Sequence, residues 1–147
     1  MQQPTRIGGI ARWHLLFGLT FAALGMLLGI YMAISHNHVE RPAHAHVMLL
    51  GFVVSTLYAI VYQVWLKATP VRLAMVQTIC HQLGALVLSL GLVLMFGGVL
   101  PEAQLEPVLA VGALSALAGV LLMIFQVLRV AQERDAPAAE AVLPGAV

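Results

Sequence analysis

Charged side chains are scarce in this sequence. Asp, Glu, Lys and Arg together make up 9% of the 147 residues, whereas soluble domains carry about 25%. This deficit excludes an ordinary soluble domain. The net charge of +1 says nothing about nucleic acid, but the sequence has no basic run, so no nucleic-acid partner is expected. The single cysteine, Cys80, excludes a disulfide within the chain, and the lack of a Cys-x-x-Cys-His motif excludes a covalently attached haem.

Hydrophobic residues dominate instead, at 61% of the chain. A spanning helix needs about 20 apolar residues, and four runs qualify: 13–34, 44–66, 73–99 and 108–130. They are continuous rather than alternating, which excludes the strands of a transmembrane barrel. The sequence therefore predicts an all-α integral membrane four-helix bundle that forms a single domain over residues 1–147. The Ala- and Pro-rich segment 136–147 has little to bury and is predicted to be disordered.

Positive charges are unevenly distributed among the segments that flank these runs. Six Lys or Arg residues fall on the side that holds both termini, and only Arg41 falls on the opposite side. Because positive residues are retained in the cytoplasm, we expect both termini there, in a bacterial-type inner membrane, with the first loop in the periplasm. The first run is too long for a signal peptide and lacks a small-residue cleavage site, so we expect a retained helix.

Four of the six histidines, His36, His38, His44 and His46, fall within eleven residues where the second run begins. His36 and His38 are either solvated loop residues or ligands. His44 follows Pro42, which suits the first turn of a helix. Helical spacing places three further residues on the face below His44, whereas His46 points about 200° away. These three are Met48, Gly51 and Ser55. His44 is therefore the strongest candidate ligand.

The two remaining histidines differ in depth. His14 lies beside an arginine and a tryptophan at the start of the first run and is predicted to be an interfacial anchor. His81 lies about nine residues beyond Arg72, or roughly 13 Å into the core at 1.5 Å per residue. An ionisable group at that depth needs a partner, and it is too deep to share an iron with His44. We expect a separate site or a buried hydrogen bond. The candidate partners are Gln77, Gln82 and Gln126.

Neutral imidazole is a ligand for zinc, copper, nickel and haem iron. No thiolate pair or carboxylate cluster accompanies the histidines, which argues against structural zinc or a di-iron site. Two axial histidines on a b-type haem fit a thiol-poor, glycine-lined interior. An alternative is a periplasmic copper or other divalent-metal site that uses His44 and His46 together with His36 and His38. A third reading is an assembly subunit whose histidines only form hydrogen bonds and whose glycines only pack helices.

The segment RPAHAHVMLLGF (residues 41–52) resembles the second transmembrane helix of the catalytic subunit of haem–copper oxidases and nitric oxide reductases. In that family the histidine of a similar Arg-Pro lead-in binds the low-spin haem, which implies the same role for His44. The resemblance covers the first two runs. The family's subunit has about twelve spans in three similar arcs of four, and further histidines for a second haem and copper. This chain has no corresponding paired-histidine helix, so oxygen reduction by one protomer is not expected.

The resemblance also carries expectations about partners. A chain like one arc could rebuild the threefold arrangement as a homotrimer, with haem b between the His44 side chains of adjacent protomers. His36, His38 and His81 are the other choices for the second axial ligand. The implied work is one-electron transfer, with quinol or a redox protein as the partner.

Overall fold

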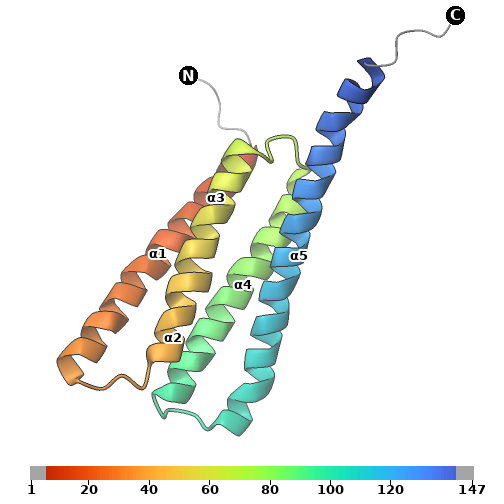
Figure 1. Ribbon diagram of the computed structural model, residues 1–147. Coiled ribbons are helices and arrows are strands. Elements are labelled where there is room, and N and C mark those ends of the chain that lie inside the picture. The colour runs from red at the N-terminus through yellow and green to blue at the C-terminus, as the bar shows by residue number, and fades with distance from the viewer. Residues whose placement is uncertain (1–5, 142–147) are drawn as a thin grey trace, which may run out of the picture.

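The computed structural model describes residues 6–141, with side chains placed for residues 6–133, and in this part of the chain helices are joined by short loops without any strand. The elements are α1 (Arg6–Ser35), α2 (Arg41–His46), the π-helix η1 (Val47–Val54), α3 (Ser55–Val64), α4 (Val71–Phe96) and α5 (Glu102–Ala141). α2, η1 and α3 follow one another without a break, so the described residues form four helices long and apolar enough to cross a membrane (Figure 1). This confirms the prediction of an all-α, multi-pass membrane protein.

The helices extend beyond the apolar runs that predicted them. α1 begins at Arg6 rather than at residue 13, and α5 begins at Glu102 rather than at residue 108. Hydropathy detects only the part of a helix that lies in hydrocarbon, whereas the backbone stays helical through the polar ends. α5 continues to Ala141 and so covers the beginning of segment 136–147, for which disorder was predicted. Residues 142–147 lie outside the described residues.

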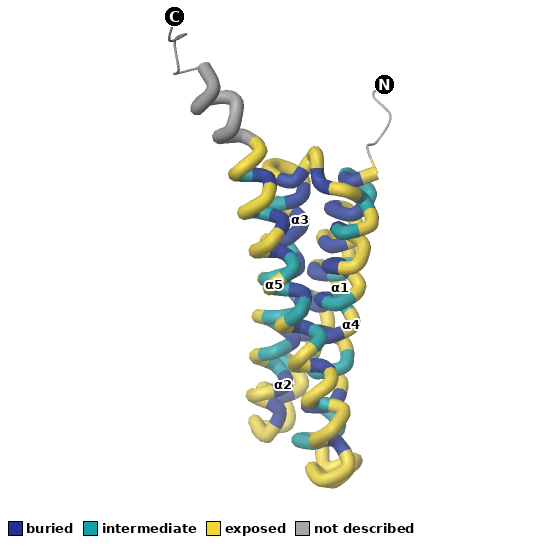
Figure 2. The backbone as a smooth tube through the Cα atoms, turned by 90° about the vertical axis from the view of Figure 1, so that its right-hand side faces the viewer, coloured by how far each residue is buried: buried dark blue, intermediate teal, exposed yellow. Residues whose placement is uncertain are grey.

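The crossings are arranged side by side in the order of the chain. α1 runs along η1 and α3, α4 lies next to α1, α2 and η1, and α5 packs along α4 (Figures 1 and 2). The beginning of α1 and the end of α5 lie at the same end of the bundle, which we call the termini end (Figure 1). The opposite end, which carries residues 36–40 and 97–101, is called the His-loop end.

Small residues let α4 and α5 approach closely. The backbone of Ala116 lies against Gly84, so that no side chain fits at this position. One helical turn or more away, a Cβ at Gly119 would lie 2.9 Å from the Cβ of His81, and one at Gly112 would lie 3.0 Å from the backbone nitrogen of Leu88. Gly84, Gly112 and Gly119 therefore lie in the interface between these two helices.

The stripe on α1 is used within the chain as well. Gly18 and Gly25 are buried against η1 and α3, and the ring of Phe21 fills the space above Gly51. Because these glycines pack inside one protomer, they give no support to the homotrimer, which the family resemblance alone implied.

Large apolar side chains cover the outside of the bundle. Leu27, Ile79 and Leu117 are each more than half exposed, as expected for helices whose outer surface contacts lipid. The buried apolar cluster lies toward the termini end, where Ile7, Tyr62 and Met123 pack together from α1, α3 and α5.

Candidate functional site

His44 lies in the seam between α1 and α2. Its ring is half-buried and faces Gly29, where an added Cβ would lie 3.3 Å from Cε1 of His44. Nδ1 of His44 is buried and has no hydrogen-bond partner. A larger residue at position 29 would press on this ring, so the glycine provides the space that the imidazole occupies.

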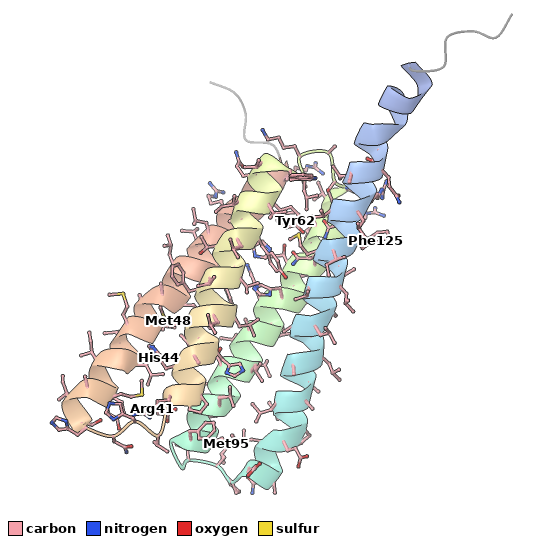
Figure 3. The ribbon with its side chains drawn as sticks, in the orientation of Figure 1. Arg41, His44, Met48, Tyr62, Met95 and Phe125 are labelled. Atoms are coloured by element: carbon pink, nitrogen blue, oxygen red, sulfur yellow. The ribbon has the colours of Figure 1, made fainter. Side chains whose placement is uncertain are left out.

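The face predicted below His44 does run along the inner side of the second crossing. Met48 packs against Gly25 of α1, and Figure 3 shows Met48 and His44 on neighbouring turns beside α1. Gly51 and Ser55 are buried. The intervening turns form the π-helix η1, where the hydrogen bonds close wider rings than in an α-helix and the register shifts locally. Such π turns occur often at functional sites.

The other loop histidines are not gathered around His44. His36 and His38 are exposed, and His36 adopts a positive φ of 52°. His46 is half-buried, and its Nδ1 donates a hydrogen bond to the carbonyl oxygen of Pro42 at 2.8 Å. Within residues 6–133, no three His, Cys, Asp or Glu side chains lie close enough together to hold a metal ion. Within these described residues, His44 therefore belongs to no group of three such side chains.

His81 forms the buried hydrogen bond that its depth required. Its Nε2 lies 2.9 Å from Oγ of Ser55, and the whole residue is inaccessible. The partner is thus Ser55 rather than one of the glutamines named from the sequence. Eleven residues separate His44 from Ser55, or about 16 Å at the α-helical rise, so His44 and His81 do not face a common site.

His14 is fully buried, and its prediction as an interfacial anchor is wrong. The ring of His14 lies on the inward face of α1, among side chains of the other helices, while Arg12 and Trp13 point outward. The ring of His14 lies 5.8 Å from that of His81, centroid to centroid. The shared helical face with buried Gly18 was the sequence signal that could have placed His14 inside.

Hydrogen bonds fix the tautomer of His14. The hydroxyl of Thr78 donates to the carbonyl oxygen of Ala74 at 2.8 Å, so its proton is already used. Nε2 of His14 lies 3.0 Å from Oγ1 of Thr78 and 3.3 Å from Oε1 of Gln77. With both oxygens accepting, the tautomer that satisfies these contacts carries its proton on Nε2. Nδ1 of His14 is then a bare acceptor, buried and without a partner.

Polar side chains from all four crossings continue this centre. The hydroxyl of Tyr62 lies 3.0 Å from Oε1 of Gln77 and 3.2 Å from Oε1 of Gln126. Nε2 of Gln77 donates to the carbonyl oxygen of Gly119 at 3.3 Å. The ring of Tyr58 meets that of His81 edge-on at 4.7 Å. We call this group the buried polar centre, and it ties α1, α3, α4 and α5 together at one level.

The described residues thus hold two distinct histidine environments. At the His-loop end, His44 has a half-buried ring in a glycine- and methionine-lined seam. Deeper in the bundle, His14 and His81 are engaged by hydroxyl groups. The sequence matches no protein-family model, no curated protein and no solved structure at a significant level.

Proposed function

We propose that this protein is a membrane-bound b-type cytochrome that takes part in one-electron transfer, with His44 as an axial ligand of its haem. The observation that carries the proposal is the seam around His44, where a half-buried imidazole with an unpartnered Nδ1 faces Gly29. Neutral imidazole is a ligand for haem iron, and the ring of His44 fits in this seam because position 29 has no side chain. The family resemblance of segment 41–52 supports the same residue.

Each part of the seam has a role in this proposal. His44 binds the iron, and Gly29 leaves space for the imidazole ring. Met48 packs on Gly25 and shields the next turn from water. The apolar lining lowers the local dielectric, which tunes the potential of a bound haem. When bound, the haem supplies a reversible one-electron couple.

The second axial ligand must come from elsewhere. His81 is not a candidate, because its Nε2 is hydrogen-bonded to Ser55 and Ser55 lies about 16 Å from His44 along the second crossing. In a homotrimer, His44 of a neighbouring protomer would complete the pair, as the family resemblance implies. His36 and His38, both exposed in the adjoining loop, are the choice within one chain.

The distribution of charge bears on the orientation of the protein in the membrane, and the orientation bears on its electron-transfer partner. Positive charges gather at one end of the described chain, with Arg6, Arg12, Lys67 and Arg72 at the termini end, whereas Glu40, Arg41, Glu102 and Glu106 lie toward the His-loop end. Together with the positive-inside rule, this distribution supports an orientation with the termini in the cytoplasm and His44 on the periplasmic side of a bacterial inner membrane. A quinol in the bilayer or a periplasmic redox protein would exchange the electron.

Absorption spectra of the purified full-length protein, oxidised and dithionite-reduced, test this function. We expect a Soret band and sharp reduced α and β bands, lost in His44→Ala and retained in His46→Ala, the matched control two residues away. Native mass spectrometry then counts haem and protomers. Three His44 side chains supply both axial ligands of one haem per trimer at most, so that ratio supports the shared site, whereas one haem per protomer would require His36 or His38 as the second ligand. A colourless protein that binds copper through the loop histidines would instead support the metal-binding alternative. Haem retained equally by both variants would exclude His44 as the ligand.

A further inference from the structure

A groove lies on the outer face of the bundle between α1 and α3, near the termini end. Its volume is about 350 Å³. Ala11 and Ala59, each 6% exposed, line its base, and these small side chains make the surface hollow here. Leu15, Ile60 and Val64 line its sides and are 40%, 54% and 64% exposed. The shape and lining suit an extended hydrocarbon chain.

A positive charge lies at the same groove. Arg12 is exposed and lines it, together with the amide of Gln63. The one ion pair in residues 6–133 joins Arg129 to Glu133 on α5, so the guanidinium of Arg12 has no carboxylate partner. A guanidinium forms bidentate, charge-assisted hydrogen bonds with phosphate.

The groove also lies at the right depth for a lipid headgroup. Trp13 and Trp65 flank it in sequence and are 64% and 44% exposed. Exposed tryptophans on spanning helices mark the membrane–water interface. Arg12 is therefore at headgroup level, whereas Leu15 and Ile60 extend from it toward the hydrocarbon. Arg12 lies at headgroup level whichever side of the membrane the termini occupy, and whether or not haem binds.

We propose that this groove binds one anionic phospholipid, with an acyl chain along Leu15 and Ile60 over the two alanines and with the phosphate on Arg12. The apolar side chains that line the groove contact the hydrocarbon chain of any phospholipid, whatever its headgroup. The single unpaired cation adds a preference for lipids with a net negative charge. Basic pockets between transmembrane helices bind anionic headgroups by this combination of contacts.

Native mass spectrometry of the full-length protein with added phosphatidylglycerol or phosphatidylcholine of the same acyl chains tests the proposal. We expect one bound phosphatidylglycerol and a preference of about fivefold over phosphatidylcholine, since one juxtamembrane cation contributes about 1 kcal/mol. Arg12→Gln should remove the preference and keep chain binding. Ile60→Trp, which fills the groove from its lip, should remove binding of both lipids.

Two matched variants serve as controls. Arg72→Gln removes a cation at the same end of the bundle but outside the groove, and Leu19→Trp adds an indole to another exposed position on α1. Both should bind lipid as the parent does. Thermal unfolding of every variant is measured alongside to establish that it is folded. Equal binding of the two lipids by the parent, or an undiminished preference in Arg12→Gln, would overturn the proposal. So would a dimer or trimer that dissociates in Ile60→Trp, because the groove would then be an interface between protomers.

Discussion

The imidazoles of His14 and His81 meet inside the bundle with their ring centroids 5.8 Å apart, although they come from the first and third crossings. Each ring has its Nε2 within hydrogen-bond distance of a hydroxyl group, on Thr78 and Ser55 respectively, and each has a buried Nδ1 without a partner. Polar groups in a membrane interior must find partners within the protein. The buried polar centre therefore fixes how α1, α3 and α4 are positioned against one another.

Replacing Ser55 with Ala should destabilise the fold, because it leaves Nε2 of His81 buried without a partner. We expect a loss of roughly 1–2 kcal/mol in the free energy of unfolding, measured by denaturation in detergent. Thr20→Ala is the control, since the hydroxyl of Thr20 is exposed and bonds only to Leu16 of its own helix. That change should stay within about 0.5 kcal/mol. Equal losses in the two variants would mean that the contact between Ser55 and His81 contributes nothing specific.

The tautomer of His14 is directly measurable. Long-range ¹H–¹⁵N spectra of ¹⁵N-histidine-labelled protein should show His14 protonated at Nε2 and not at Nδ1, because Thr78 and Gln77 offer it only acceptors. In Thr78→Val the Nε2 resonance should shift while the tautomer persists, since Oε1 of Gln77 remains. A spectrum with the proton on Nδ1 would contradict this arrangement of donors.

The contact between Gly84 of α4 and Ala116 of α5 should not tolerate a side chain. Because the backbone of Ala116 already fills this space, Gly84→Val must push the helices apart, at a cost of about 1–3 kcal/mol or more. Gly9→Ala is the matched control, since nothing lies within 4 Å of its added Cβ. In a helix that change should be neutral or stabilising by up to about 1 kcal/mol. Thermal unfolding would compare the two, and an unaffected Gly84→Val would show that α4 and α5 are not in backbone contact.

Much of this architecture follows from the sequence. Long apolar runs predict the crossings, and three- and four-residue spacing predicts that Gly51, Ser55, Tyr58 and Tyr62 share the inner face of the second crossing, where all four are buried. Helix ends were predicted less well, because hydropathy does not report where a polar turn stops being helical. His14 was misplaced for a different reason: the helical face that it shares with buried Gly18 points into the bundle.

Partners across helices were the part that the sequence did not predict. The depth of His81 shows that a partner is needed, but only the relative rotation and height of α3 and α4 select Ser55 over three nearby glutamines. The π-helix at Val47–Val54 has no apparent signal in the apolar pattern, and it changes the register between His44 and Ser55. Ligation by His44 stays a prediction, which the haem spectra described above would test.

Glu40 provides a prediction about pH. It lies in the His-loop end and is 5% exposed, with Oε2 buried and unpartnered. Its Oε1 lies beside the C-terminal end of α4, where an added Cβ at Gly97 would be 2.9 Å away. Burial raises the pKa of Glu40 above its usual value, because the charged carboxylate loses hydration. The folded protein therefore binds this proton more tightly than the unfolded chain does.

The sign of the pH effect follows from linkage. Stability should be highest below the ordinary carboxyl pKa and should fall as pH rises from there through the raised pKa of the folded state, above which the full cost remains. Glu40→Gln has no proton to lose, so it should flatten this part of the profile and be more stable than the parent at pH 8, by about 1 kcal/mol. Glu106→Gln, an exposed position at the same end of the bundle, should keep the profile of the parent. Unfolding temperatures in detergent from pH 4 to 8 would decide, and a parent protein that gains stability over this range relative to Glu40→Gln would contradict the assignment.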